Sequence, residues 1–290
     1  MASEDVKIIG GRQNFWLWSK HQGFDLTHPA TPSSQPVYPR IPLMTTKERA
    51  TIDPAKTALV VIDMQNYFLS PLLGRPSNSI GLGLVDKLVN EAIPACRKAG
   101  IPVLWLGWGL TEEDLDNIPP SIARGYEFRL DKNFDEPREL PPLGEEIGKV
   151  KLEDGTIIQA GRTMMRDQWN TTFYPRLVEA SESQDMWISK NRLSGFWGQV
   201  EIEETLKRRG IKTLLFTGEN LDQCVAATLQ DAYTKGWDCL MLSDGCGTAS
   251  PEFARKCIEY ECEGGWGFVL TCQQLADGVE NMQTSPGGGH

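Results

Sequence analysis

The sequence of 290 residues contains only three histidines, His21, His28 and His290. The first two lie in an N-terminal stretch and the third is the last residue, so a Ser-His-Asp triad or a Cys-His dyad would have to be built from peripheral positions. The seven cysteines include no Cys-x-x-Cys pair, which argues against a zinc cluster and against a disulfide scaffold. Any catalytic chemistry is therefore expected to use a base other than histidine.

Long apolar runs are also missing. No stretch of about 18 apolar residues occurs, so no membrane span is expected, and the N-terminus lacks the apolar segment of a signal peptide. Acidic residues outnumber basic ones by 39 to 29, and the net charge of −10 argues against binding to nucleic acid. We expect a cytoplasmic protein with reduced thiols and with neither a membrane nor a nucleic acid as partner.

The two ends of the chain differ from its middle in composition and in the structure that they are expected to form. Residues 1–48 are predicted to form an extended, proline-rich arm, because residues 27–42 hold five prolines, which block helix formation. Phe15, Trp16 and Trp18 precede these prolines, and they either anchor the arm to a partner subunit or pack on the chain's own domain. Residues 277–290, which end in SPGGGH, are predicted to be a flexible tail.

Between these ends, residues 49–276 are predicted to form one domain in which short apolar runs alternate with helical patterns. The runs are continuous rather than alternating with polar residues, which is typical of strands buried on both faces of a parallel sheet. The order predicts an α/β fold with a doubly wound, mostly parallel sheet. Residues 108–180 interrupt this order and are predicted to be an insertion over the sheet, with a hairpin-like segment, KVKLEDGTIIQ. The predicted strands are residues 58–62, 102–106, 186–189, 213–216, 239–242 and 267–270.

Three reactive side chains follow predicted strands. Asp63 comes directly after residues 58–62, Lys190 after residues 186–189, and Cys224 a few residues after the run TLLF. A single charged residue after a strand is usually a solvated loop residue. However, the carboxyl ends of parallel strands are where ligands bind, so an acid, a base and a thiol at three such ends indicate a catalytic site.

Of these three residues, Cys224 is the one whose local sequence most clearly indicates a catalytic role. The segment GENLDQCVAATLQDAY predicts a strand end, a turn and then a helix with Asp222 as its N-cap. This places Cys224 in the first helical turn, where the helix dipole and free N–H groups stabilise a thiolate and could bind an oxyanion. The alternative is a small, buried apolar cysteine. We favour that alternative for Cys96, Cys239, Cys257 and Cys272, and leave Cys246 and Cys262 open.

Three motifs in order, VVIDMQNYFLSP, ISKNRLSGFW and FTGENLDQCVAATLQDAYTKGWDCLMLSDGCGT, resemble the isochorismatase-like cysteine hydrolase superfamily over about residues 56–275. The resemblance implies a six-stranded parallel sheet flanked by helices, and an Asp–Lys–Cys triad on Asp63, Lys190 and Cys224. It also implies a cis peptide bond between Asn220 and Leu221, with backbone N–H groups there turned towards the substrate oxygen.

The sequence also departs from its relatives. Leu221 stands where many members carry threonine, and no histidine follows the second predicted strand, where the nicotinamidase branch holds a metal. We therefore expect no metal and no other cofactor. Enzymes of the family that cleave isochorismate lack the nucleophilic cysteine. Around the segments SGF and RRGI, the sequence most resembles the ureidoacrylate amidohydrolase and N-carbamoyl amidase branch. Leu110 and Leu193 replace aromatic residues of that branch, so its substrate is not carried over.

We predict a metal-independent cysteine hydrolase that cleaves a carbon–nitrogen bond other than a peptide bond, in a small-molecule amide or ureido compound. Asp63 would take the proton of Cys224, Lys190 would stabilise the anions, and the backbone at Asn220 and Leu221 would hold the oxyanion. Hydrolysis of an ester or vinyl ether, and a catalytically silent binding protein, remain alternatives. The resemblance also implies a homo-oligomer. Predicted pocket walls, each of which could equally be a core residue, are Phe68, Trp108, Phe196 and Trp197.

Overall fold

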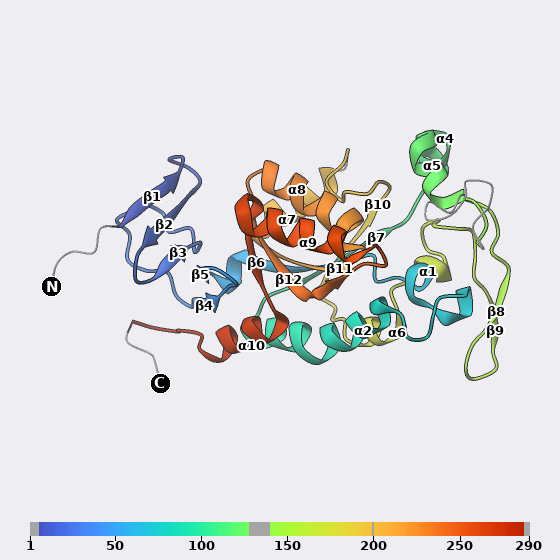
Figure 1. The fold of residues 1–290 in the computed structure, drawn as a ribbon, viewed down its shortest axis with the longest axis horizontal. Helices are drawn as coiled ribbons and strands as arrows, with labels where there is room; N and C mark the ends of the chain where they lie inside the picture. The colour runs from blue at the N-terminus through green and yellow to red at the C-terminus, as the bar shows by residue number, and fades with distance from the viewer. Residues whose placement is uncertain (1–5, 128–139, 199, 287–290) are drawn as a thin grey trace.

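The fold is built on a six-stranded sheet, seen in a computed structural model that describes residues 6–127, 140–198 and 200–286 (Figure 1). The strand order is β10-β7-β6-β11-β12-β13 and every neighbouring pair is parallel. Each strand overlaps one predicted apolar run, so the predicted sheet is confirmed. The strands are β6 (Thr57–Ile62), β7 (Val103–Trp108), β10 (Met186–Lys190), β11 (Thr213–Glu219), β12 (Asp238–Gly247) and β13 (Phe268–Leu270).

Helices cover both faces of this sheet, as continuous apolar strands require. Leu59 and Val61 of β6 face the core below α2 (Ile80–Lys87), α3 (Ile93–Ala99), α6 (Pro175–Glu179) and α10 (Cys272–Glu280). Val60 and Ile62 face the opposite core, which packs on α7 (Val200–Arg208) and α8 (Ala226–Thr234), with α9 (Glu252–Glu261) on the same side (Figure 1). Shorter helical turns complete the domain: η1 (Pro54–Lys56), α1 (Asn66–Leu69), η2 (Pro71–Leu73), η3 (Leu88–Ala92), η4 (Trp169–Thr171) and η6 (Cys262–Trp266).

The N-terminal segment is a sheet of its own, so the predicted extended arm is corrected here. Five strands lie in the order β1-β2-β3-β5-β4, and the predicted boundary at residue 48 falls inside this sheet. Most of the prolines lie in the connection between β3 and β4, where they interrupt no strand, and Pro42 lies in the edge strand β4, where proline is tolerated. The strands are β1 (Lys7–Gly10), β2 (Phe15–Ser19), β3 (Gly23–Asp25), β4 (Ile41–Met44) and β5 (Arg49–Ile52).

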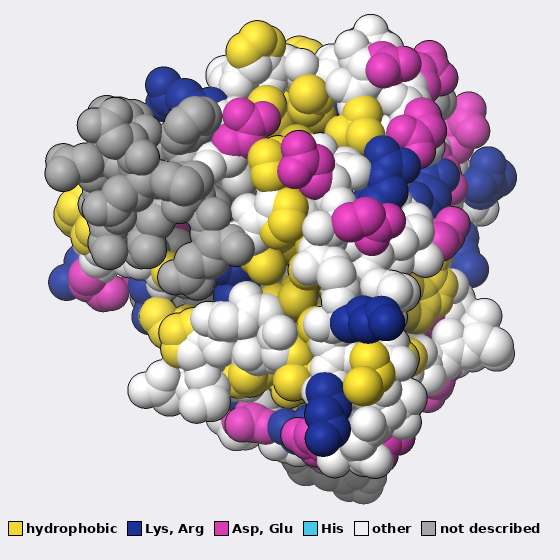
Figure 2. Space-filling view, turned by 90° about the vertical axis from the view of Figure 1, so that its right-hand side faces the viewer, with side chains coloured by type: hydrophobic (Ala, Val, Ile, Leu, Met, Phe, Trp, Pro, Cys, Tyr) yellow, Lys and Arg dark blue, Asp and Glu magenta, His cyan; other side chains and the backbone are white. Residues whose placement is uncertain are grey.

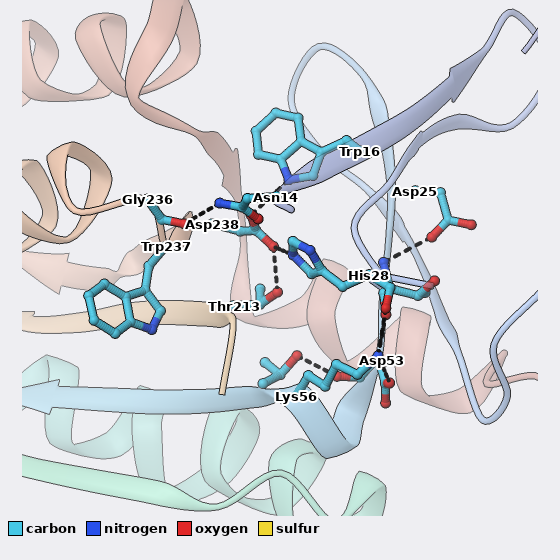
Figure 3. A network of polar contacts seen from close by, with 12 residues as sticks. Asn14, Trp16, Asp25, His28, Asp53, Lys56, Thr213, Gly236, Trp237 and Asp238 are labelled. Carbon is cyan, nitrogen blue, oxygen red and sulfur yellow. Dashed lines mark hydrogen bonds and ion pairs between the residues drawn. The ribbon is translucent and has the colours of Figure 1, made fainter. Parts of the chain in front are cut away.

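This sheet packs on the chain's own domain through a buried carboxylate at the start of β12 (Figure 3). Asp238 accepts hydrogen bonds from Trp16 Nε1 at 2.7 Å and from Thr213 Oγ1 at 2.9 Å, and its Oδ2 lies 2.7 Å from His28 Nε2. The ring of Trp16 also packs on Phe268, with 5.6 Å between centroids. Of the two interpretations of the aromatic cluster, packing on the same chain is therefore the one observed, and His28 takes part in this structural network.

The insertion lies mainly beyond the carboxyl ends of the strands rather than over a face of the sheet (Figure 1). It contains α4 (Glu112–Asp116), α5 (Pro120–Glu127) and the predicted hairpin, formed by β8 (Lys149–Lys151) and β9 (Ile157–Gln159). Residues 1–5, 128–139, 199 and 287–290 lie outside the described residues, and with them the start of the predicted arm, part of the insertion and the end of the predicted tail.

The C-terminal tail begins later than predicted. Helix α10 continues to Glu280, and Gln283 pairs with Arg40 of the N-terminal segment, so the predicted start at residue 277 lies inside a helix. Within the ranges that the structure describes, no helix combines the length and the apolar character needed to cross a membrane.

Candidate active site

Three predicted residues meet at the carboxyl edge of the central sheet. Asp63 directly follows β6 in a left-handed backbone conformation (φ 54°), and Lys190 is the last residue of β10. Cys224 lies in a single π-helical turn, η5 (Leu221–Val225), between β11 and α8. Because β10, β7, β6 and β11 are neighbours, their carboxyl ends lie along one edge, and the structure brings all three side chains together.

The ammonium group of Lys190 links the other two. Its Nζ lies 3.0 Å from Asp63 Oδ2 and 3.4 Å from Cys224 Sγ, and it donates to the carbonyl of Arg192 at 3.1 Å. The ring of Trp108 completes its surroundings, with the centroid 4.1 Å from Nζ, a favourable cation–π contact. Lys190 is completely buried, and Asp63 and Cys224 are only 1% and 7% exposed. The group is therefore a desolvated acid, cation and thiol in direct contact.

Burial dominates the protonation of this group. It raises the pKa of Asp63, although the charge of Lys190 and contacts with Cys224 and Trp108 lower it. Burial and the charge of Asp63 raise the pKa of Cys224 to about 12, against the effect of Lys190. Desolvation therefore opposes the stabilised thiolate that the sequence predicts, and the nearby cation offsets only part of that effect. With its pKa raised, the Cys224 side chain is a thiol, and the raised pKa of Asp63 makes the carboxylate beside it a stronger base.

The backbone before Cys224 differs from the expectation by one residue. The cis peptide bond joins Glu219 to Asn220, not Asn220 to Leu221. Asn220, rather than Asp222, is the N-cap of the turn that begins at Leu221, and its side-chain oxygen accepts a hydrogen bond from Ala249 N at 3.2 Å. The first turn of a helix leaves N–H groups without intrahelical acceptors, so the backbone from Asn220 to Cys224 can offer donors to an oxyanion.

The four predicted pocket residues lie in different parts of the molecule. Trp108 lies in the site, over Lys190, whereas Phe68 is half-buried and packs edge-to-face on Tyr67. The structure places Phe196 in the core, where its ring packs on Trp237 at 5.2 Å. Trp197 is 62% exposed and lines an outer groove of about 520 Å³ together with Arg192, Leu193 and Ile122. Adjacent aromatics in a sequence can thus point to opposite environments.

Two functional candidates were not predicted. Buried Gln65, in the motif DMQ, donates to the carbonyl of Trp108 at 2.8 Å and accepts from its N–H at 2.9 Å, so it fixes the backbone that carries the indole. Glu219, the last residue of β11, is 8% exposed. A charged residue at the end of the buried run TLLFTGE, directly before the nucleophile turn, was the signal that could have revealed it.

On the face that contains this edge, hydrophobic side chains run down the middle of the view and many charged groups lie to their right (Figure 2). In the described part of the chain, no group of three or more His, Cys, Asp and Glu side chains is arranged to hold a metal ion. Metal independence itself remains a prediction.

Comparison with known proteins agrees with this fold. The isochorismatase domain model matches residues 57–260, so the chain belongs to the isochorismatase family, whose members are hydrolases. Similar solved structures include a cysteine hydrolase from Pseudomonas syringae pv. phaseolicola 1448A, at 19% identity, with 79% of this chain and 94% of that chain covered and a TM-score of 0.58.

Two further structures are enzymes that act on nitrogen compounds according to their names. N-carbamoylsarcosine amidase from Thermoplasma acidophilum is 20% identical over 75% of this chain and 96% of its own, with a TM-score of 0.52. Nicotinamidase from Bacillus subtilis is 19% identical over 74% of this chain and 99% of its own, with a TM-score of 0.52. At these identities the similarity supports the shared fold.

Proposed function

We propose that this protein is a cysteine hydrolase that cleaves a carbon–nitrogen bond in a small-molecule amide or ureido compound through a thioester at Cys224. The observation that carries the proposal is the contact of Lys190 Nζ with both Asp63 Oδ2 (3.0 Å) and Cys224 Sγ (3.4 Å) at the carboxyl edge of the sheet. A thiol next to a base that is itself held by a third group is the arrangement of covalent catalysis. The fold shared with an N-carbamoylsarcosine amidase and a nicotinamidase favours an amide or ureido bond over an ester.

In the first half-reaction, Asp63 takes the proton of the Cys224 thiol as the sulfur attacks the substrate carbonyl. The carbonyl oxygen becomes an oxyanion, which accepts hydrogen bonds from the backbone N–H groups between Asn220 and Cys224. Lys190 offsets the negative charge throughout. The carbon–nitrogen bond then breaks, and Asp63 returns its proton to the departing nitrogen, which leaves ammonia or an amine and a thioester.

In the second half-reaction, a water molecule attacks the thioester carbon. Asp63, again a carboxylate, removes a proton from that water, and the proton passes to the sulfur as the carbon–sulfur bond breaks. The acid product leaves and the thiol is restored. Atoms and protons balance with water as the only co-substrate, and each step uses a group already present in the site.

The proposal includes a cytoplasmic homo-oligomer with a small-molecule substrate as its partner, without nucleic acid or membrane. The net charge of −10 supports the exclusion of nucleic acid. Oligomer size can be measured by light scattering.

The function is tested with a panel of N-carbamoyl compounds, primary amides and esters, scored for release of ammonia or acid. We expect turnover of an amide or ureido compound by the wild type and by Cys257→Ala, whose thiol is exposed, and none by Cys224→Ala. Turnover of esters alone would replace the proposal with an esterase. No turnover, together with a Cys224 no more reactive towards a thiol probe than buried Cys96, would indicate a silent binding protein.

A further inference from the structure

Trp108 lies within the catalytic group, but the mechanism above assigns it no role. It is the last residue of β7 and pairs in register with Lys190, the last residue of β10, so the two side chains leave neighbouring strands side by side. Its ring centroid lies 4.1 Å from Lys190 Nζ, and only 2% of its surface is exposed. The ring is therefore in direct contact with the cation that links Asp63 to Cys224.

The indole N–H of Trp108 is buried as well, and in the described part of the chain no hydrogen bond of ordinary geometry satisfies it. The indole N–H of Trp105, in the same strand, instead donates to Asp185 Oδ2 at 2.9 Å. Both carboxylate oxygens of Asp63 are likewise buried and, over the same ranges, accept no hydrogen bond of ordinary geometry. A donor and acceptors that are left without hydrogen bonds in one buried site call for an explanation.

The unsatisfied N–H affects both side chains that exchange a proton in the proposed reaction. Burial raises the pKa of Asp63 and the pKa of Cys224, and the side chain of Trp108 is among the groups that lower both. Because the N–H is the only polar group of an indole, it is the group that stabilises a negative charge at either place. A donor that serves both ends does not oppose the transfer of charge from one to the other.

We propose that Trp108 is a positioning residue that keeps the buried pair of Asp63 and Lys190 ionised during the reaction. Its ring face stabilises the ammonium group. Its indole N–H stabilises the negative charge first on the carboxylate and then on the sulfur, once the carboxylate has taken the proton of the thiol. The inference rests on the proposed function and adds to it the group that maintains the base. Its basis is the contact of the ring with Lys190 Nζ, together with the buried N–H.

An ion pair that is shielded from water needs such support. A proton that passed from Lys190 to Asp63 would leave an amine and a carboxylic acid, and that acid could not take the proton of Cys224. Burial favours the neutral pair, whereas an aromatic face and an N–H donor favour the charged one. Gln65 fixes the indole for this role, since its side chain accepts from the Trp108 backbone N–H at 2.9 Å and donates to the Trp108 carbonyl at 2.8 Å.

The test compares the full-length wild type with Trp108→Phe and Trp108→Leu on a substrate identified from the panel. Phenylalanine keeps an aromatic face and removes the N–H, whereas leucine removes both. We expect kcat to fall about tenfold or more in Trp108→Phe and at least about threefold further in Trp108→Leu, with KM within about threefold of wild type. Because loss of the N–H raises the pKa of Asp63, the acid limb of kcat/KM against pH should move to higher pH by about 0.5–1 in Trp108→Phe.

Trp105→Phe is the matched control, because it removes an indole N–H of the same strand outside the catalytic group. It should lower the melting temperature while kcat and the acid limb stay as in the wild type. The titratable groups that act on Asp63 are Lys190 and Cys224, and the Asp63 charge in turn acts on Glu219, whose pKa is about 8. All of them are present in each protein compared, so none accounts for a difference between the variants.

Three results in Trp108→Phe would overturn the inference: an acid limb that does not move, a kcat within about threefold of wild type, or a loss that lies chiefly in KM, as expected of a pocket wall. Equal values of kcat in Trp108→Phe and Trp108→Leu would overturn the role of the ring face. The same loss of kcat in Trp105→Phe would show a structural effect and overturn the inference. If the wild type turns over no amide or ureido compound, the proposed function fails before any variant is compared, and the inference fails with it.

Discussion

The ammonium group of Lys190 contacts the carboxylate of Asp63 and the thiol of Cys224 while it is completely buried. Because its charge lowers the pKa of Cys224, Lys190→Ala should raise that pKa further and leave Asp63 as an unpaired buried acid. We expect kcat to fall on the order of 10²–10³-fold. The measurement is the rate of iodoacetamide alkylation against pH in wild type and variant, and an unchanged profile would contradict the role of Lys190.

Glu219 makes stability depend on pH in a defined direction. Its folded pKa of about 8 lies above the ordinary value of 4.5, so proton binding stabilises the fold fully below pH 4.5. That contribution is lost as the pH rises through about 8. Glu219→Gln cannot ionise, and its free energy of unfolding should exceed that of the wild type by on the order of 2–4 kcal/mol more at pH 8.5 than at pH 4.5.

Urea denaturation of both proteins at these two pH values measures the difference. A gap that stays constant with pH would show that the carboxyl group is solvated in the folded protein. A gap that grows as expected would show that the Glu219 carboxyl group is desolvated in the folded protein, at the end of β11.

At the scale of elements, the strands of the central sheet could be predicted because each is a continuous apolar run buried on both faces, such as residues 58–62 and 213–216. The extension of β11 to Glu219 was not visible, since Thr217, Gly218 and Glu219 are not apolar. The N-terminal sheet was missed because proline counts do not show where a turn ends and a strand begins. Its strands are short and their pairing is partly non-local.

The site, like the fold, could be predicted only in part. Asp63, Lys190 and Cys224 could be placed together because parallel strands end at one edge. The raised pKa of Cys224 could not be predicted, because desolvation depends on what packs around the thiol from distant segments, including Trp108. Phe196 is buried and Trp197 is exposed, and this difference likewise depends on packing rather than on sequence spacing.

The N-terminal sheet is fastened to the domain by Asp238, which accepts from Trp16 and Thr213 and lies beside His28 (Figure 3). Asp238→Ala leaves these buried groups without their acceptor, and should lower the free energy of unfolding by about 2–4 kcal/mol. Asp238→Asn keeps one accepting oxygen and should lose less. Thermal unfolding of both variants tests this, and an unchanged melting temperature in Asp238→Ala would show that the network does not hold the two sheets together.

At the scale of the whole molecule, a single family domain carries Asp63, Lys190 and Cys224, and the N-terminal sheet and the insertion lie at its opposite ends (Figure 1). The chemistry proposed for this domain uses only Asp63, Lys190, Cys224 and backbone groups. Prolonged treatment with EDTA should therefore leave kcat/KM unchanged within error. Loss of activity with EDTA, restored by added zinc or another divalent ion, would contradict a mechanism built on these side chains alone.

The central claim is that Cys224 forms a covalent acyl intermediate, and trapping that intermediate tests it most directly. Wild-type enzyme is mixed with a substrate identified from the panel, quenched in acid within the first turnovers, digested and examined by peptide mass spectrometry. The account predicts the acyl mass on the peptide that contains Cys224, and no such adduct on the other cysteine peptides or in Cys224→Ala. Continued turnover by Cys224→Ala, or turnover by the wild type with no acyl adduct at Cys224 under quench conditions that preserve a thioester standard, would contradict it.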